Sequence, residues 1–423
     1  MFKTLRNAWS IPDLRKKMLY TLLMIFVFRL GSFIPVPSLN AEALKQMVEG
    51  NNSLFGLLDT FSGGSFSNAT IFAMGITPYI NASIILQLLT VAIPALERLS
   101  KEGEEGRKVI AKWTRIVTVI LAFIQATGLY FGIAGAVATK SVSTYITIVA
   151  TFTAGTAILM WLGEKITQNG VGNGISIIIF SGIVAGLPSM AERLYKNITM
   201  NEGMWWLIAV VVVLALLMIA FVVFITDAER RISVSYAKRV VGRKMYGGQS
   251  THIPMKVAMA GVIPIIFAMS ILSFPSTIMQ FTGAPTSGFW LKFWSFFTPQ
   301  STVYIVIYFL LIVFFTYFYT AIQFNPVEVA NNMKNNGGFV PGIRPGKPTS
   351  DYISRILSKI TLTGAFFLGI IAIVPLVLGK AVPMLSGIQI GGTSLLIMVG
   401  VALETVKQIE SQMLMRHYKG FLD

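Results

Sequence analysis

The chain contains no cysteine and only two histidines among its 423 residues. The absence of cysteine excludes disulfides, thiolate catalysis and cysteine-based metal sites. His252 and His417 each occur alone in a basic segment, without the spacing of a zinc site, so we expect structural or surface roles for both. A Walker motif, a zinc motif and a nucleophile elbow are also missing. The sequence therefore predicts no enzyme, cofactor or metal, and energy for any work must come from a gradient or a partner.

Charged residues make up only 12% of the chain, whereas hydrophobic residues make up 54% and gather in ten long runs. A helix needs about 20 apolar residues to cross the hydrocarbon core of a membrane, which is close to the length of these runs. The runs lie near Met18 to Pro37, Ile71 to Pro94, Trp113 to Ala134, Tyr145 to Leu162, Ile175 to Met190, Met204 to Ile225, Val257 to Gln280, Thr302 to Phe324, Ile356 to Leu378 and Gly391 to Ile409. The sequence predicts an all-α polytopic membrane protein with ten spans.

Lysine and arginine are distributed unevenly between the gaps that separate these runs. Most of the 34 basic residues fall in the N-terminal arm, in every second gap and in the tail, which places those segments and both termini on the cytoplasmic side. The net charge of +16 suits anionic lipid, an acidic partner or ribosomal RNA as a cytoplasmic contact. Ordinary topological charge bias explains the same excess equally well.

Ten spans divide at the outer loop Pro188 to Gly203 into five and five. An odd number of spans in each half gives the halves opposite orientations, as in the inverted repeats of many transport folds. We therefore expect an N-terminal half at 1–190 and a C-terminal half at 191–423 around a pathway at the membrane midplane.

The outer segment Ser38 to Thr70 contains one short helical pattern. Leu54, Leu57, Leu58 and Phe61 follow the spacing of one helix face, and Gly63 and Gly64 end the pattern. About ten residues of helix reach only about 15 Å, half of a bilayer core, so this segment cannot span. It is either a helix on the outer surface or a re-entrant segment inside a pore.

The longest cytoplasmic loops, about 227–256 and 323–359, are rich in glycine and proline, which suit turns and extended arms better than helices. Arginine and lysine at the tips of such arms can engage carboxylate or phosphate, so both loops are candidate docking arms.

Several segments closely resemble SecY, the family of channel subunits of the bacterial protein translocon. The resemblance covers nearly the whole chain, in blocks at Phe28 to Pro37, Phe61 to Thr90, Lys101 to Lys108, Met160 to Pro188, Glu229 to Arg239, Gln249 to Ala268, Phe324 to Gly346 and Gly391 to Ile397. It implies a protein-conducting channel, with an hourglass pore between two inverted five-helix halves. It also implies the bacterial inner membrane as location, and SecE, SecG, the SecA ATPase, the ribosome, signal peptides and preproteins as partners.

The resemblance also assigns roles to particular positions. It implies a pore ring of aliphatic side chains at Ile76, Ile80, Ile179, Ile266 and Ile397. It implies a plug at about 52–66, with Leu54, Leu57, Leu58, Phe61, Gly63 and Gly64. The polar positions of a lateral gate are Asn81, Gln125 and Ser270, and the docking positions for SecA or the ribosome are Arg239, Arg243, Lys244 and Arg344.

Two further expectations concern charge inside the membrane. Arg29 lies well within the first span, where a charge usually marks a functional or paired site, and we expect it to pair with a backbone carbonyl. The rival function is an ion-coupled secondary transporter of small solutes, which would carry ionisable groups on midplane helices. Apart from Arg29 we find no strong midplane charge, so the channel is favoured. A non-conducting scaffold or insertase would share the lateral opening.

Overall fold

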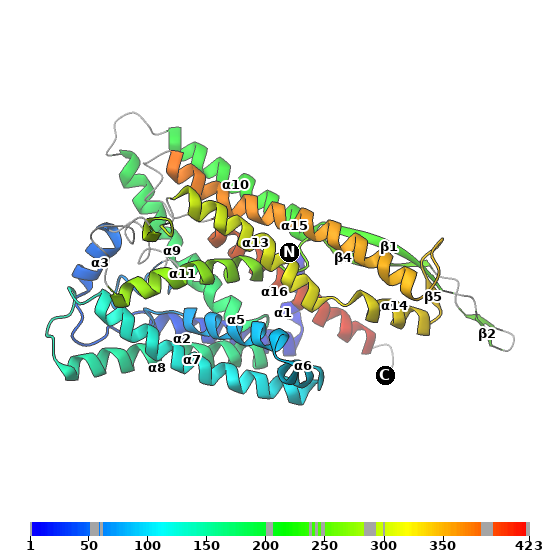
Figure 1. The fold of residues 1–423 in the computed structure, drawn as a ribbon, viewed down its shortest axis with the longest axis horizontal. Coiled ribbons are helices and arrows are strands. Elements are labelled where there is room, and N and C mark those ends of the chain that lie inside the picture. The colour runs from blue at the N-terminus through cyan, green and yellow to red at the C-terminus, as the bar shows by residue number, and fades with distance from the viewer. Residues whose placement is uncertain are drawn as a thin grey trace.

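The structure is a computed structural model that describes residues 2–50, 59, 62–199, 206–236, 239–241, 244–246, 250–282, 293–298, 301–381 and 392–419. Helices form most of it, and a narrow β arm projects from one end (Figure 1). The longer helices are α1 (Phe2–Ser10), α2 (Pro12–Gly31), α3 (Ala41–Gly50), α5 (Thr77–Ala92), α6 (Pro94–Lys101), α7 (Glu104–Gly132), α8 (Val142–Asn169), α9 (Gly174–Thr199), α10 (Trp206–Asp227), α11 (Ile263–Thr282), α13 (Thr302–Gln323), α14 (Pro326–Asn335), α15 (Lys347–Ala381) and α16 (Gly392–Lys419). The strands are β1 (Glu229–Tyr236), β2 (Arg239–Val241), β3 (Lys244–Tyr246), β4 (Ser250–Lys256) and β5 (Gly338–Phe339).

Each of the ten apolar runs contains a helix, which confirms the predicted class of all-α polytopic membrane protein. Within the described ranges, five helices are long and apolar enough to cross a membrane, and the bent pair α5 and α6 makes a sixth. The five are α7, α8, Ala209–Asp227 of α10, the continuous stretch Thr302–Asn335 of α13 and α14, and α15.

The other helices that correspond to predicted apolar runs have shorter apolar stretches or carry charged residues. The apolar part of α9 is Gly174–Ser189 and that of α11 is Ile263–Pro275. Arg29 lies on α2, and Glu404 and Lys407 lie on α16. Three of these helices, α9, α11 and α16, contribute to the site described below.

The second predicted span starts later than expected. Residues 71–76 form turns, and the helix begins at Thr77, so the prediction of a span from Ile71 was wrong at this end. With 16 residues, α5 reaches about 24 Å, less than the ~30 Å hydrocarbon core. It ends at Ala92, because the next residue, Ile93, precedes Pro94 and has an extended backbone, and α6 then leaves at a bend of 101°. Turns likewise precede α11, which begins at Ile263 rather than near Val257.

The outer segment contains α3, a helix that we did not predict. The side chain of Asn40 caps it by accepting hydrogen bonds from the backbone N–H groups of Glu42 (2.9 Å) and Ala43 (3.3 Å). Leu44 and Val48, one turn apart, are buried against α7 and α8. The signal was present in the sequence as an asparagine followed by strong helix formers.

The arm is built from both loops that we predicted to be cytoplasmic. β1 pairs antiparallel with β4, from Glu229 opposite Lys256 to Ser235 opposite Ser250, and its other edge pairs with β5 through Ser235 and Phe339. The described residues of the loop 227–256 therefore form the extended arm that we predicted. For the loop 323–359 the prediction was half wrong, because α14 and the start of α15 are helical and Pro326 and Pro348 occupy first-turn positions, whereas Pro341 and Pro345 lie in turns.

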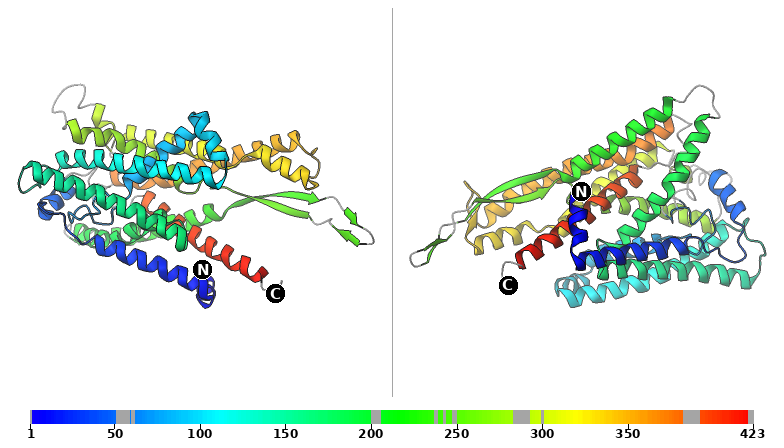
Figure 2. Two further views of the ribbon diagram at one scale, coloured as in Figure 1. Left: turned by 90° about the horizontal axis from the view of Figure 1, so that it is seen from below. Right: turned by 180° about the vertical axis from the view of Figure 1, so that it is seen from behind.

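The two ends of the molecule carry different segments of the chain. The arm and the C-terminal end of α16 lie at one end, and α3 lies at the other (Figures 1 and 2). The N-terminal α1 packs against α16, where buried Ala8 and Ile409 share one apolar cluster. The basic loops and both termini therefore gather away from the outer segment.

Candidate functional site

Five isoleucines from four helices converge in the middle of the bundle. Ile76, Ile179 and Ile397 are buried in one apolar cluster, and Ile80 and Ile266 are partly buried against it. These are the positions that the resemblance gave to a pore ring; they come from α5 or the residue before it, α9, α11 and α16. Their side chains offer contact surface and no hydrogen bond.

Local structure sets the spacing of the first two isoleucines. Ile76 is the residue before α5, and its carbonyl accepts the backbone N–H of Ile80 at 3.1 Å, so the two side chains lie one turn apart. Pro78 occupies the first turn, where a missing N–H costs nothing. The α5 helix thus begins at the apolar cluster.

The described part of the plug segment is buried inside the bundle. Leu54, Leu57, Leu58 and Phe61 lie outside the described residues, whereas Gly63 and Gly64 are described with left-handed φ values of 64° and 84°. The backbone of Gly63 contacts Gly182 of α9, since a Cβ at position 63 would lie 2.6 Å from the Gly182 carbonyl oxygen. Gly182 follows Ile179 by one turn of α9. This contact favours the re-entrant interpretation of the segment.

Hydrogen bonds hold the turns that follow these glycines. The backbone N–H of Ser67 donates to Asp59 Oδ1 at 2.8 Å, and the hydroxyl of Thr70 donates to the carbonyl of Ser65 at 3.0 Å. Phe66 is buried in the cluster formed with α3, α7 and α8. The segment is therefore anchored at its C-terminal end.

The three lateral-gate positions lie on α5, α7 and α11, which pack against one another. Asn81 and Ser270 are buried, and Gln125 is half-buried. The Oδ1 atom of Asn81 is buried without a hydrogen-bond partner among the described residues. A buried acceptor left without a partner costs about 1–3 kcal/mol, so this interface is not packed for maximum stability.

The docking positions divide between two places on the arm. Arg239 and Lys244 lie on the paired strands β2 and β3, which extend beyond β5 in Figure 1, and Arg243 lies outside the described residues. Arg344 lies in the turn between β5 and α15 and is exposed. Its carbonyl accepts the hydroxyl of Thr349 at 2.8 Å, so the backbone is fixed while the guanidinium is free to bind.

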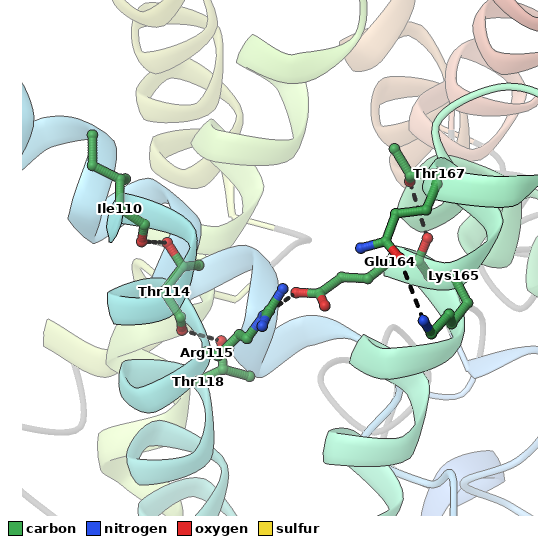
Figure 3. Close-up of polar contacts among 9 residues, drawn as sticks. Ile110, Thr114, Arg115, Thr118, Glu164, Lys165 and Thr167 are labelled. Atoms are coloured by element: carbon green, nitrogen blue, oxygen red, sulfur yellow. Dashed lines mark hydrogen bonds and ion pairs between the residues drawn. The ribbon is translucent and has the colours of Figure 1, made fainter. Parts of the chain in front are cut away.

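An interhelical ion pair was not singled out by the sequence. Arg115 of α7 donates through Nε to Glu164 Oε1 of α8 at 2.7 Å (Figure 3). Helix α5, which carries Tyr79 and Ile80, packs against both α7 and α8. The ion pair joins α7 to α8 beside α5, the helix that carries Ile80. In the sequence, the only sign of this pair was an acidic residue, Glu164, at the end of an apolar run.

At one of its guanidinium nitrogens, within the described part of the chain, Arg29 lacks the pairing with a backbone carbonyl that we expected. Its Nη1 atom is buried without a hydrogen-bond partner among the described residues. Across the same part of the chain, no group of three or more His, Asp or Glu side chains is placed to hold a metal ion.

Comparison with known proteins agrees with this geometry. Residues 70–406 match the family profile described as SecY. A protein translocase subunit SecY from Halalkalibacterium halodurans is 49% identical over 434 residues, and the match covers 100% of both chains. A second, from Streptomyces galbus, is 50% identical over 443 residues with the same coverage.

One solved structure, described as that of a protein conducting channel, superposes with a TM-score of 0.64 at 19% identity and covers 94% of this chain and 92% of its own. At such identity the likeness concerns the fold, and the relatives and the profile carry the assignment. The resemblance predicted from the sequence is confirmed: the chain belongs to the SecY family.

Proposed function

We propose that the chain is the channel subunit of a bacterial protein translocase, which passes unfolded polypeptide outward and releases apolar segments sideways into lipid. One observation carries the proposal: five isoleucines contributed by four helices, α5, α9, α11 and α16, lie in or against one apolar cluster. A constriction lined by branched apolar groups excludes water and ions when closed, and it can part around any side chain because no specific hydrogen bond is lost. The family membership and the similarity to a channel structure support the same function.

Cross-linking of a stalled secretory precursor tests this function directly. The chain has no cysteine, so a single Ile179→Cys variant carries one defined thiol. We expect an adduct with a precursor that carries cysteines along its length, whereas Ile148→Cys, buried on α8 in a separate cluster, should give none. Equal labelling at both positions, or none at Ile179, would reject the pore.

The topology of the proposal places both termini in the cytoplasm of a bacterial inner membrane. The two inverted halves would be 1–190 and 191–423, and the ring takes Ile76, Ile80 and Ile179 from the first and Ile266 and Ile397 from the second. Because both halves contribute, a small separation of the halves opens the ring.

The partners follow from the exposed surfaces. The arm, with Arg239, Arg243, Lys244 and Arg344, would receive the SecA ATPase or the ribosome, while SecE and SecG would cover the exposed apolar faces of the bundle. The signal peptide would act at the interface between α5 and α11.

Substitution of Gly63 tests the plug. Gly63→Ala adds a methyl group against the Gly182 carbonyl and forces alanine into a left-handed conformation, so the segment must move away from α9. We expect a several-fold rise in the ion conductance of resting channels in planar bilayers. Gly64→Ala is the matched control, since its φ is similar but its added Cβ would meet only Asn68 Nδ2 at 3.8 Å. Equal conductance in the two variants would contradict a sealing role for the Gly63 contact.

Substitution of Asn81 tests the gate. Asn81→Leu replaces a buried acceptor without a partner by an apolar group of similar size, which should stabilise the closed interface by about 1 kcal/mol or more. Export in vesicles should slow several-fold, most of all for a precursor with a weakly apolar signal peptide. Asn81→Ala, which leaves a cavity instead, should slow export less. Faster export by Asn81→Leu would rule out this explanation.

A further inference from the structure

The segment Gly170 to Gly174, which joins α8 to α9, lies where several helices meet. The backbone N–H of Val171 donates to the hydroxyl of Thr21 on α2 at 3.0 Å. The side chain of Val171 is buried in one apolar cluster with Ala8 of α1, Leu14 of α2 and Ile409 of α16. The segment therefore contacts helices from both ends of the chain.

Gly172 lies close to Thr405 of α16. Its φ is +82°, a conformation that side chains with a Cβ rarely adopt. A Cβ there would lie 3.2 Å from Thr405 Oγ1, 3.4 Å from Thr405 Cγ2 and 2.8 Å from Ile177 Cδ1. An added Cβ would therefore strain the backbone at position 172, displace the end of the Ile177 side chain and press against Thr405 of α16.

The same two helices carry pore-ring residues farther along. On α16, Ile397 and Val401 precede Thr405 at intervals of four residues, so all three lie on one face. Ile397 and Val401 share an apolar cluster with Ile177 and Ile179 of α9. Thr405 lies about 12 Å along the helix from Ile397, at 1.5 Å per residue.

We propose that Gly172 and Thr405 are positioning residues, which set the spacing between α9 and α16 and thereby the fit of Ile179 against Ile397. The inference rests on the proposed function of the pore ring. The seal depends on contact, and a gap of about 0.5–1 Å already forfeits a quarter to a half of the dispersion attraction between two surfaces. A methyl group added at Gly172 lies 3.2 Å from Thr405 Oγ1 and pushes α16 away from α9, which is the direction that weakens this attraction.

Disulfide formation between Ile179→Cys and Ile397→Cys measures the spacing in a chain that has no other thiol. We expect oxidation of the full chain in membranes to be rapid with Gly172 and several-fold slower with Gly172→Ala. Gly103→Ala is the matched control, because Gly103 has a φ of +79° and nothing within 4 Å of an added Cβ. An unchanged disulfide rate with Gly172→Ala, or an equal fall in rate with Gly103→Ala, would overturn the inference. The absence of any disulfide in the double-cysteine variant that keeps Gly172 would also overturn it.

A second substitution distinguishes a change in the distance between α9 and α16 from a general loss of structure. Thr405→Ala removes both atoms of the threonine that the new methyl group would meet, so the double variant Gly172→Ala/Thr405→Ala should recover most of the disulfide rate. If Gly172→Ala fails to accumulate in membranes, Thr405→Leu crowds the same contact from α16 without backbone strain and should slow the reaction similarly. A normal rate with Thr405→Leu would also overturn the inference.

Ion conductance of the same variants, without the cysteines, completes the test. Gly172→Ala should raise the resting conductance several-fold and Gly172→Ala/Thr405→Ala should lower it again. The failure of the proposed function would appear elsewhere, as absence of precursor adducts at Ile179→Cys. A slowed disulfide with normal precursor adducts and unchanged conductance would show that the contact does not govern the seal.

Discussion

Ile179→Lys is expected to raise the ion conductance of the resting channel at least tenfold and to slow protein export. Ile179 is 4% exposed in the cluster that contains the other four ring positions. Burying an ammonium group without a partner costs several kcal/mol, and each 1.4 kcal/mol changes an equilibrium tenfold. The closed, dry arrangement should therefore give way to a hydrated one. Single-channel recording in planar bilayers measures the leak, and precursor uptake into vesicles measures export.

The controls for Ile179 distinguish charge from packing. Ile179→Leu conserves volume and apolar character, so we expect nearly normal conductance and export. Ile178→Leu, at a buried neighbour that is not a ring position, should behave in the same way. Membrane levels of each variant must match the wild type. A lysine at position 179 that left both leak and export unchanged would show that the constriction lies elsewhere.

Arg344→Glu should reduce SecA-driven transport at least tenfold while the channel still inserts into the membrane. The backbone of its turn is fixed on one side by the hydrogen bond from Thr349 and on the other by Ile343, which packs on the apolar base of the arm. The exposed guanidinium is therefore presented to a partner from a rigid support, and charge reversal replaces attraction by repulsion. Reconstituted vesicles with purified SecA and a precursor give the rate.

A nearby basic residue, Lys347, provides the control for Arg344. Lys347→Glu changes the same net charge three residues away at an exposed position, and we expect only a small effect. Arg344→Lys should fall between the two, since lysine keeps the charge but not the planar fork of donors. Equal losses for the glutamates at 344 and 347 would indicate a general electrostatic effect and contradict a specific docking role.

Apolar runs and charge bias were enough to predict the helices and their membrane class. Burial in lipid imposes a length and a composition on each span, and both can be read along the chain. The predictions were wrong in segments where lipid imposes little constraint on length or composition. Residues 71–76 are apolar but form turns inside the protein, and α3 depends on the cap at Asn40 rather than on an apolar run.

The candidate site could be predicted only through resemblance to a family. Periodicity shows which face of a helix is buried but not which helix covers it, so nothing in the spacing of Ile76, Ile179 and Ile397 brings them together. The same holds for the Arg115 and Glu164 ion pair and for the pairing of β1 with β5, whose partners lie far apart in the chain.

By itself, then, the sequence determined the helices, their class and the side on which the basic segments gather, because these depend on local composition. The tertiary structure alone decided that isoleucines from separate helices form one cluster and that Gly172 lies against Thr405. Such contacts depend on how closely two backbones approach, and that distance is set by the packing of the whole bundle.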